Sequence, residues 1–239
     1  MIKFLKELLY PSLTKCIICN EEIFIDNDFC ICPNCMTNLP HILNNFCKVC
    51  GRKVVGESIV CEHCKTTKFD FKVARAPFYY IGIMRKVVYH LKYDNAKYLA
   101  PYLSKILYSY YKTSEDFKDI DLITCVPIHK NRLKKRGYNQ SELLLESFLQ
   151  TNKVNTKIIE KVIDTGSQTE KTYIERLSGL ENAFSITDKN FVKNKNILII
   201  DDIFTTGATI NTISKELLKA GAKSVKGLTL CSTAFEYKK

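Results

Sequence analysis

Two adjacent carboxylates, Asp201 and Asp202, follow an apolar run in the segment ILIIDDIFTTGATI. The apolar run predicts a buried strand, and the residues after it predict a helix. The loop between them would present unpaired backbone N–H groups at the helix N-terminus, where the helix dipole favours an anion. The loop residues that could hold this anion are Thr205, Thr206, Gly207, Ala208 and Thr209.

The acid pair and the loop together predict a site for a sugar phosphate. Gly207 permits a tight turn and the close approach of a phosphate to the backbone. The two carboxylates would repel a phosphate, but they suit the hydroxyls of a sugar whose phosphate lies in the loop. A helix start capped by its own threonines is the simpler alternative, and the preceding acid pair argues against it. We therefore expect a ribose 5-phosphate here.

Cysteine pairs near the N-terminus predict bound metal. Nine of the 11 cysteines precede residue 65, and eight form Cys-x-x-Cys pairs: Cys16 and Cys19, Cys32 and Cys35, Cys47 and Cys50, Cys61 and Cys64. Because four thiolates complete a tetrahedral structural zinc site, we expect one or two structural Zn²⁺ ions. The spacing does not decide between pairing in sequence order and an interleaved arrangement, and Cys30 is a rival ligand. An iron–sulfur cluster would use the same ligands.

Composition and charge suggest two parts. With 46% hydrophobic residues, the 239-residue chain can bury a sizeable core. No apolar run is long enough to span a bilayer, and the charged start does not resemble a secretory signal, so a cytoplasmic protein is expected. Residues 1–68 carry a net charge of +1 and residues 69–239 carry +10. We predict a cysteine-rich zinc-binding module over 1–68 and a larger domain over 69–239.

The larger part predicts an α/β fold. Strand-like segments alternate with helix-like ones. The expected strands are 121–127, 157–163, 196–200 and 224–230, and the expected helices lie around 87–91, 98–110, 141–150 and 210–218. This alternation predicts a mainly parallel sheet with helices on both faces and ligands at the carboxyl ends of the strands.

The segment ILIIDDIFTTGAT resembles the phosphoribosyl pyrophosphate motif of type I phosphoribosyltransferases. The segments LKYDNAKYLA, VPIHKNRLKKRGYNQSELL and GSQTEKTYIERLSGLENAF resemble successive blocks of the ComF family of competence proteins, which also carries a cysteine-rich N-terminal extension. The resemblance covers almost the whole chain. It implies a type I phosphoribosyltransferase-like fold behind a zinc module, and a role in handling single-stranded DNA during natural transformation.

The resemblance also implies roles for individual residues. Asp201 and Asp202 would bind the ribose hydroxyls as catalytic residues, and the loop of Thr205, Thr206, Gly207, Ala208 and Thr209 would bind the 5-phosphate. Pyrophosphate would lie near Pro127, Ile128 and His129 and would need Mg²⁺ to neutralise its charges. A basic run could bind this pyrophosphate or DNA, although such runs are often only solvated surface; its cations are Lys130, Arg132, Lys134, Lys135 and Arg136.

Two functions follow as alternatives. The first is transfer of phosphoribosyl from phosphoribosyl pyrophosphate to an acceptor, through a displacement stabilised by electrostatics. The second is binding of this compound without turnover, in an adaptor for single-stranded DNA, the competence helicase and DNA-processing proteins. Two departures from the family pattern bear on the choice. Phe204 stands where many members carry a smaller aliphatic residue, and no nucleobase-specificity element is recognisable.

Overall fold

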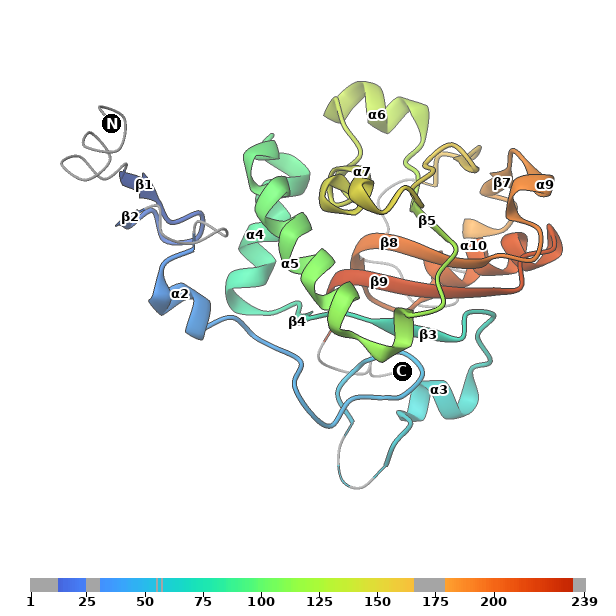
Figure 1. Cartoon of the computed structure of the whole chain (residues 1–239), viewed down its shortest axis with the longest axis horizontal. Helices are drawn as coiled ribbons and strands as arrows, with labels where there is room; N and C mark the ends of the chain where they lie inside the picture. Colours follow the sequence, from blue (N-terminus) through green and yellow to red (C-terminus); the bar gives the residue numbers. More distant parts are fainter. Residues whose placement is uncertain (1–12, 25–30, 55, 57, 166–178, 234–239) are drawn as a thin grey trace.

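A parallel sheet forms the centre of the molecule (Figure 1). The structure, a computed structural model, describes residues 13–24, 31–54, 56, 58–165 and 179–233. The strand order is β3-β9-β8-β5, and β4 also pairs with β9. The strands are β3 (Val73–Arg75), β4 (Phe78–Tyr79), β5 (Leu122–Cys125), β8 (Asn196–Phe204) and β9 (Ser224–Ser232). All these pairings are parallel, which confirms the predicted sheet type.

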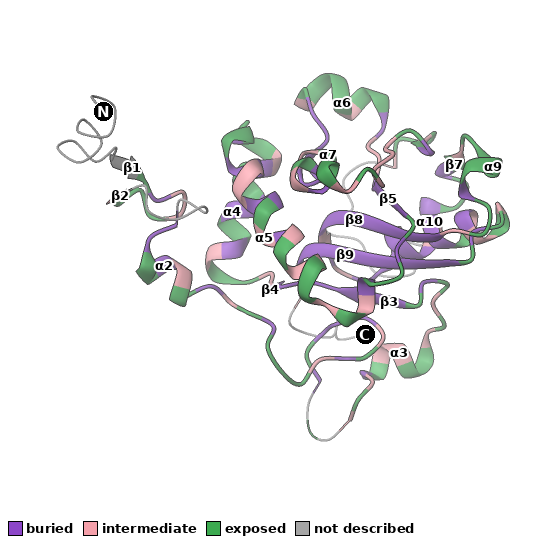
Figure 2. Cartoon of the chain, viewed as in Figure 1, coloured by how far each residue is buried: buried purple, intermediate pink, exposed green. Residues whose placement is uncertain are grey.

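The two faces of the sheet belong to separate hydrophobic clusters. Along β8, Ile197 and Ile199 join one cluster, whereas Leu198 and Ile200 join the other, as the two-residue period of a strand requires. Helices α4 (Gly82–Tyr93) and α5 (Ala100–Thr113) cover the second face, and α10 (Ala208–Lys219) covers the first. Figure 2 shows these strands buried along their length, with the outward sides of the helices exposed. The predicted covering of both faces is confirmed.

Helix α10 forms where the sequence predicts a helix after the acid pair. Its buried Ile210, Ile213 and Leu217 recur at helical spacing and pack against the sheet. The helix ends at Lys219, and Gly221 follows with φ of 96°, a left-handed conformation that suits the position after a helix. The predicted stop at Gly221 is confirmed.

Short helices connect the larger elements. They are α2 (Pro33–Thr37), α3 (Glu62–Thr66), η1 (Lys97–Leu99), η2 (Glu115–Phe117), α6 (Lys130–Arg136), α7 (Gln140–Leu143), η3 (Glu146–Thr151) and α9 (Lys189–Val192). Among them, α6 and α7 follow β5, so they lie toward the carboxyl end of the sheet (Figure 1).

The single helix predicted over 141–150 is wrong. The chain forms α7, a break, and the 3₁₀ helix η3. Ser104 of α5 explains the break: its Oγ donates to the carbonyl of Leu144 at 2.8 Å and accepts the N–H of Ser147 at 2.8 Å. A side chain inserted in this way replaces the hydrogen bonds that would continue an α-helix.

The strand predicted over 157–163 exists but lies outside the parallel sheet. Strand β6 (Ile159–Lys161) pairs antiparallel with β7 (Phe184–Ile186), and Ile159 lies opposite Ile186. These strands form a separate two-stranded sheet. The strand predicted in this segment is therefore confirmed, and it pairs outside the main sheet.

Two cysteine ribbons precede the sheet in the chain. The first ribbon, residues 13–37, contains β1 (Leu13–Lys15), β2 (Glu22–Phe24) and α2, and Figure 1 shows it to one side of α4. The second ribbon, residues 46–66, packs on β3, where the N–H of Ala74 donates to the carbonyl of Val49 at 2.8 Å. Buried residues of the second ribbon belong to one of the two sheet clusters, whereas those of the first ribbon form a small cluster of their own, and its partly buried Ile17, Ile18 and Met36 pack against the other sheet cluster. The boundary at residue 68 stays a prediction.

Candidate functional site

The acid pair lies at the carboxyl end of β8 and is almost fully buried. Asp201 is 9% exposed and Asp202 is 4% exposed. Oγ of Ser141 and the N–H of Asp202 both donate to Oδ1 of Asp201, at 2.7 and 2.9 Å. Nζ of Lys92 on α4 lies 2.8 Å from Oδ2 of Asp202, although this oxygen has no aligned hydrogen-bond donor among the described residues. Asp202 is therefore held by an ion pair, and Asp201 is held by two hydrogen bonds.

Burial and mutual repulsion shape the protonation of this site. Burial and the neighbouring charge of Asp202 raise the pKa of Asp201 to about 7, against the hydrogen bond from Ser141 and the charge of Lys92. Burial by itself lowers the pKa of Lys92, but the two carboxylates raise it above its ordinary value, so this ammonium stays charged. A ligand that supplies hydroxyl donors or a cation would stabilise the ionised form of Asp201.

The segment Thr205–Thr209, predicted to bind phosphate and called the phosphate loop below, leads from β8 into the first turn of α10. Gly207 has φ of 82° and immediately precedes the helix. Within the described residues, no acceptor takes the N–H groups of Thr206 and Gly207, while the N–H of Ala208 donates to Oγ1 of Thr206 at 3.3 Å. Open N–H groups at the start of a 12-residue helix fit an anion. All five loop residues predicted to bind an anion lie together here.

Packing against Phe204 also requires a glycine at position 207. A Cβ on Gly207 would lie 2.7 Å from the ring of Phe204 and 3.2 Å from the ring of Phe69. Phe204 is 2% exposed and packs edge-on against Phe71, with ring centres 6.0 Å apart. The bulky residue noted in the sequence therefore lies beneath the loop and does not fill the ligand side of the acid pair.

The loop after β5 lies next to the acid pair. The N–H of Val126 donates to the carbonyl of Ile200 at 3.0 Å, which places Pro127 and Ile128 beside the carboxyl end of β8. His129 is buried and caps α6, because its Nδ1 accepts the N–H of Asn131 at 3.3 Å. These positions bring the predicted pyrophosphate loop close to the predicted ribose site.

The basic run forms α6, and none of its residues is buried. Beside it lies a hollow of about 880 Å³, whose lining includes the cations Lys92, Lys97, Arg132, Lys135 and Arg136. Asp164, also on this lining, lies 3.6 Å from Nε of Arg132 and 3.5 Å from Nδ1 of His129. Lys130 and Lys134 do not line the hollow. The run thus divides between the hollow and open solvent.

Sequence reasoning assigned no role to Lys92 or Arg52. Lys92 lies in the segment LKYDNAKYLA and reaches Asp202. Arg52 lies between the cysteine pairs, and its guanidinium donates to the carbonyl of Thr205 in the phosphate loop. A lone cation carries no sequence signal for contacts with residues more than 100 positions away, so only the fold shows these two.

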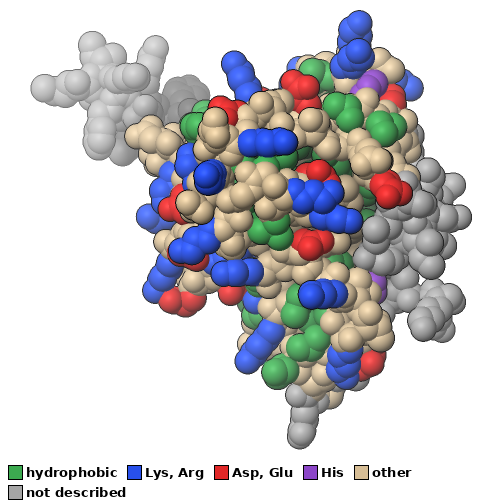
Figure 3. Space-filling model, turned by 90° about the vertical axis from the view of Figure 1, so that its right-hand side faces the viewer, with side chains coloured by type: hydrophobic (Ala, Val, Ile, Leu, Met, Phe, Trp, Pro, Cys, Tyr) green, Lys and Arg blue, Asp and Glu red, His purple; other side chains and the backbone are tan. Residues whose placement is uncertain are grey.

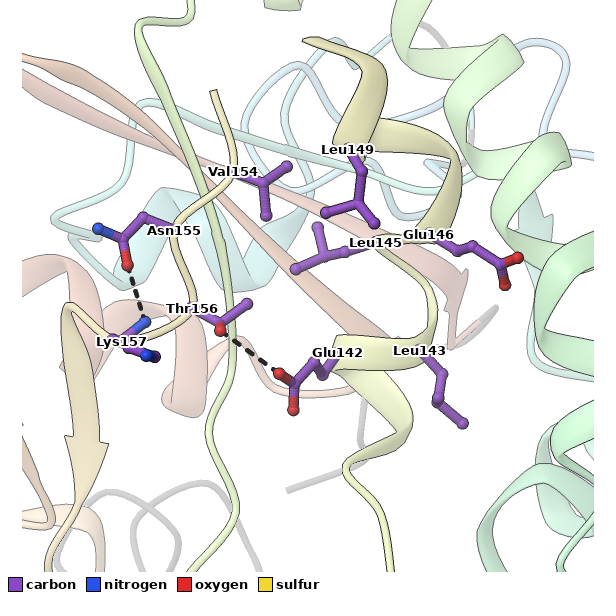
Figure 4. Close-up of a pocket in the computed structure, with 9 residues that line it drawn as sticks. All are labelled: Glu142, Leu143, Leu145, Glu146, Leu149, Val154, Asn155, Thr156 and Lys157. Carbon is purple, nitrogen blue, oxygen red and sulfur yellow. Dashed lines mark hydrogen bonds between the residues drawn. The ribbon is translucent and has the colours of Figure 1, made fainter. Parts of the chain in front are cut away.

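A second hollow, of about 430 Å³, lies between the α7–η3 region and the segment 154–157 (Figure 4). Its walls carry Glu142, Glu146 and three leucines, and Oγ1 of Thr156 donates to Glu142 at 3.4 Å. Its lining carries one cation, Lys157, and two carboxylates, so it offers no pair of cations that could bind a phosphate. This hollow is a poor fit for a sugar phosphate.

The cysteines gather into two clusters, and the pairing follows sequence order. Within each cluster all four Sγ atoms lie within 4.8 Å of one another: Cys16, Cys19, Cys32 and Cys35 in the first ribbon, Cys47, Cys50, Cys61 and Cys64 in the second. Sγ atoms of Cys19 and Cys32, and of Cys50 and Cys61, are 3.6 Å apart. The rival ligand Cys30 lies outside the described residues. Four-thiol sets of this spacing fit structural zinc.

Comparisons with known proteins agree with this geometry. Residues 5–65 match the double zinc ribbon domain, and residues 134–239 match the phosphoribosyl transferase domain. "Competence protein ComFC" of Streptococcus pneumoniae is 31% identical to this chain, and the match covers 90% of this chain and 99% of the relative. The chain belongs to the ComF family of competence proteins. The resemblance found in the sequence is thus confirmed.

Other ComF-family relatives match over similar lengths. "Competence protein F" of Haemophilus influenzae is 27% identical over 89% of this chain and 94% of the relative. A solved hypoxanthine phosphoribosyltransferase of Staphylococcus aureus is 16% identical, covers 61% of this chain and 69% of its own, and has a TM-score of 0.32. Membership supports a role in competence and a phosphoribosyltransferase-like fold behind zinc ribbons. In the described part of the chain, no helix is both long and apolar enough to cross a membrane.

Proposed function

We propose that this ComF-family protein binds phosphoribosyl pyrophosphate and takes part in handling single-stranded DNA during natural transformation, in the cytoplasm. The observation that carries the first half is the buried acid pair next to a phosphate loop with open N–H groups. Asp201 and Asp202 would hold the ribose hydroxyls, and Thr205–Thr209 the 5-phosphate. Pro127, Ile128 and His129 would meet the pyrophosphate.

Magnesium fits this proposal on the chemistry of the donors. Hard oxygen ligands suit Mg²⁺, and the protein offers carboxylate oxygens at the acid pair while the ligand would supply its pyrophosphate oxygens. When bound, the cation would neutralise charge on the pyrophosphate. The residues of the chain would bind and orient: Lys92 forms an ion pair with Asp202, and Ser141 holds the carboxyl of Asp201 in place.

The second half of the proposal rests on charge. Figure 3 shows Lys and Arg side chains interspersed with Asp and Glu over one face of the molecule, so the net charge is not gathered into one block there. By contrast, α6 carries five cations in seven residues, and its first turn contains no acidic residue. Single-stranded DNA is the proposed partner of this helix, with the competence helicase and DNA-processing proteins as further proposed partners.

An active phosphoribosyltransferase with an unidentified acceptor is the alternative. The observation that favours it is the size of the hollow beside α6, about 880 Å³, which leaves room beyond a pyrophosphate. In that case the acid pair would stabilise charge that develops on the ribose as the anomeric bond breaks. Release of pyrophosphate on addition of candidate acceptors separates turnover from binding alone.

Calorimetry with phosphoribosyl pyrophosphate and Mg²⁺ tests the binding. We expect the parent protein to bind and Asp202→Asn to weaken binding at least tenfold, because a charge-assisted hydrogen bond contributes about 1.5–3 kcal/mol. Asp188→Asn is the matched control, since it makes the same chemical change at the exposed N-cap of α9, where asparagine caps equally well. Absence of binding by the parent would refute the proposal.

A further inference from the structure

Arg52 belongs to the second ribbon, but its side chain lies beneath the phosphate loop. It is 2% exposed, and its guanidinium donates to the carbonyl oxygen of Thr205. Oγ1 of Thr233 donates to the same oxygen at 3.3 Å. The guanidinium carbon lies 5.5 Å from the centre of the Phe204 ring, over its face. One buried cation from the ribbon therefore contacts both the loop backbone and the ring that supports it.

Among the described residues, no Asp or Glu forms an ion pair with the buried guanidinium of Arg52, and its Nε has no acceptor. A buried charge without a partner is costly, and an electrostatic interaction with Cys50 of the second ribbon offsets this cost. An anion in the phosphate loop, on the other side of the Thr205 peptide, would add to this compensation.

The backbone of Arg52 is fixed by the cysteine cluster and by β3. The N–H of Cys47 donates to the carbonyl of Arg52 at 2.6 Å, and the N–H of Gly51 donates to the carbonyl of Cys47 at 2.9 Å. Gly51 has φ of 70°, and a Cβ there would lie 2.8 Å from the carbonyl oxygen of Ala74. This turn between the metal ligands therefore holds Arg52 against the sheet in one place.

We propose that Arg52 is a positioning residue for the phosphate loop, supplied by the second zinc ribbon. Its hydrogen bond fixes the peptide between Thr205 and Thr206. Because hydrogen bonds in a chain polarise one another, a cation on the carbonyl of this peptide strengthens the N–H of Thr206 as a donor to phosphate. The inference rests on the proposed ligand and adds a residue outside the matched phosphoribosyltransferase segment.

Variants of two arginines at the same interface test the proposal. Arg52→Met removes the donor to the loop, and Arg75→Met is the control, since Arg75 donates to the ribbon carbonyls of Lys48 and Cys47 without touching the loop. We expect Arg52→Met to weaken ribose 5-phosphate binding at least tenfold and pyrophosphate binding less than threefold. Arg75→Met should lower the melting temperature while changing both affinities less than threefold.

Zinc release provides a readout that a merely structural role would not produce. If ligand and second ribbon are coupled through Arg52, ribose 5-phosphate should slow zinc release from the second cluster to a chromogenic chelator, because coupling between sites is reciprocal. Release from the first cluster, which has no such contact with the loop, is the internal control. Arg52→Met should abolish the protection. Should that variant fold poorly, Thr233→Val removes the other donor and should weaken ribose 5-phosphate binding about threefold.

The outcomes separate this inference from the proposed function. A parent protein that binds neither ribose 5-phosphate nor phosphoribosyl pyrophosphate overturns both. A parent that binds, together with Arg52→Met and Thr233→Val variants of unchanged affinity, overturns the inference alone. Arg52→Met could instead lose ribose 5-phosphate and pyrophosphate binding to the same extent, with the same losses in Arg75→Met. That result would show that Arg52 acts only through general stability, and it would also overturn the inference.

Discussion

Asp201 is held in an environment that opposes its own charge. It is buried beside a second carboxylate, Asp202, toward the carboxyl end of β8. Burial and this neighbouring charge favour its neutral form even though Ser141 donates a hydrogen bond to it. Such a group destabilises the free protein near neutral pH and is useful only when a ligand or cation compensates it. Strain of this electrostatic kind is typical of functional sites and less typical of structural ones.

We therefore predict that Asp201→Asn stabilises the ligand-free protein at pH 8 and stabilises it much less at pH 5. The pKa of Asp201 rises from its ordinary value of 3.8 to about 7 on folding, so the folded protein binds this proton more tightly than the unfolded chain. Its favourable contribution is fully present below about pH 3.8 and is lost progressively as pH rises from there through 7. Asparagine removes the penalty that remains at pH 8. Thermal unfolding should show a rise of a few degrees at pH 8.

The same variant should lose ligand binding, so stability and function are expected to move in opposite directions. Asp188→Asn serves again as the control, because its carboxylate is exposed at the N-cap of α9. Equal melting shifts at pH 5 and pH 8 would contradict the assigned ionisation of Asp201.

At the scale of elements, α6 is held mainly at its ends. None of its residues is buried, His129 caps its start, and Gly137 ends it with φ of 79°. Arg136 is a partial exception, because it donates to Gln140 and lies over the ring of Tyr93. The exposed lysines of α6 are thus free to serve ligands without supporting the fold.

Neutralising Lys130, Lys134 and Lys135 together to glutamine should weaken single-stranded DNA binding and flatten its salt dependence by about two units. Each lost phosphate contact removes about 0.7 from the slope of log affinity against log salt. The melting temperature should stay unchanged, since these side chains are exposed and glutamine is a good helix former. Salt titrations on one oligonucleotide measure the slope.

A matched triple variant at the opposite end of the sheet controls for net charge. Lys189, Lys193 and Lys223 are exposed and precede β8 and β9, so they lie near the amino ends of the strands. Their replacement by glutamine should leave the slope unchanged. An equal effect of both triples would indicate nonspecific attraction, and no effect of the α6 triple would place DNA elsewhere.

Local signals predicted the elements around the acid pair well. The apolar run of β8, the face of α10 and Gly221 all act through nearest neighbours and periodicity, and all are confirmed. The break between α7 and η3 depends on a hydrogen bond from Ser104, about 40 residues earlier. Strand β6 lies outside the main sheet because it pairs with β7. Contacts between distant parts of the chain decide such features, so periodicity does not reveal them.

The candidate site divides in the same way. Spacing alone indicated the loop residues and the eight cysteines. The pairing of those cysteines required the fold, because both possible pairings satisfy the same spacing. Lys92 and Arg52 reach the acid pair and the loop from separate elements, and their sequence neighbours give no sign of it.

At the scale of the whole molecule, the two ribbons are unequal. The first has its own small cluster of buried residues, and it contacts α5 and the cluster on that face of the sheet only through partly buried side chains. The second shares a cluster with β8, β9 and α10, and Arg75 ties its carbonyls to Asp116 through one guanidinium. Metal in the first ribbon should therefore stabilise mainly that ribbon, whereas metal in the second should also stabilise the sheet.

Selective disruption of each cluster should reveal this difference. Cys16→Ser/Cys19→Ser should remove one zinc and leave the main thermal transition within about 2 °C of the parent. Cys47→Ser/Cys50→Ser should remove the other zinc and lower that transition by 10 °C or more, because a structural zinc site contributes folding free energy directly and here the loss reaches the core. Zinc content and calorimetric unfolding are the measurements.

If the second variant is insoluble, stepwise chelation of the parent gives the same comparison: loss of the first ion should spare the main transition, and loss of the second should lower it. Equal sensitivity of the main transition to both clusters would contradict the unequal roles assigned to the ribbons.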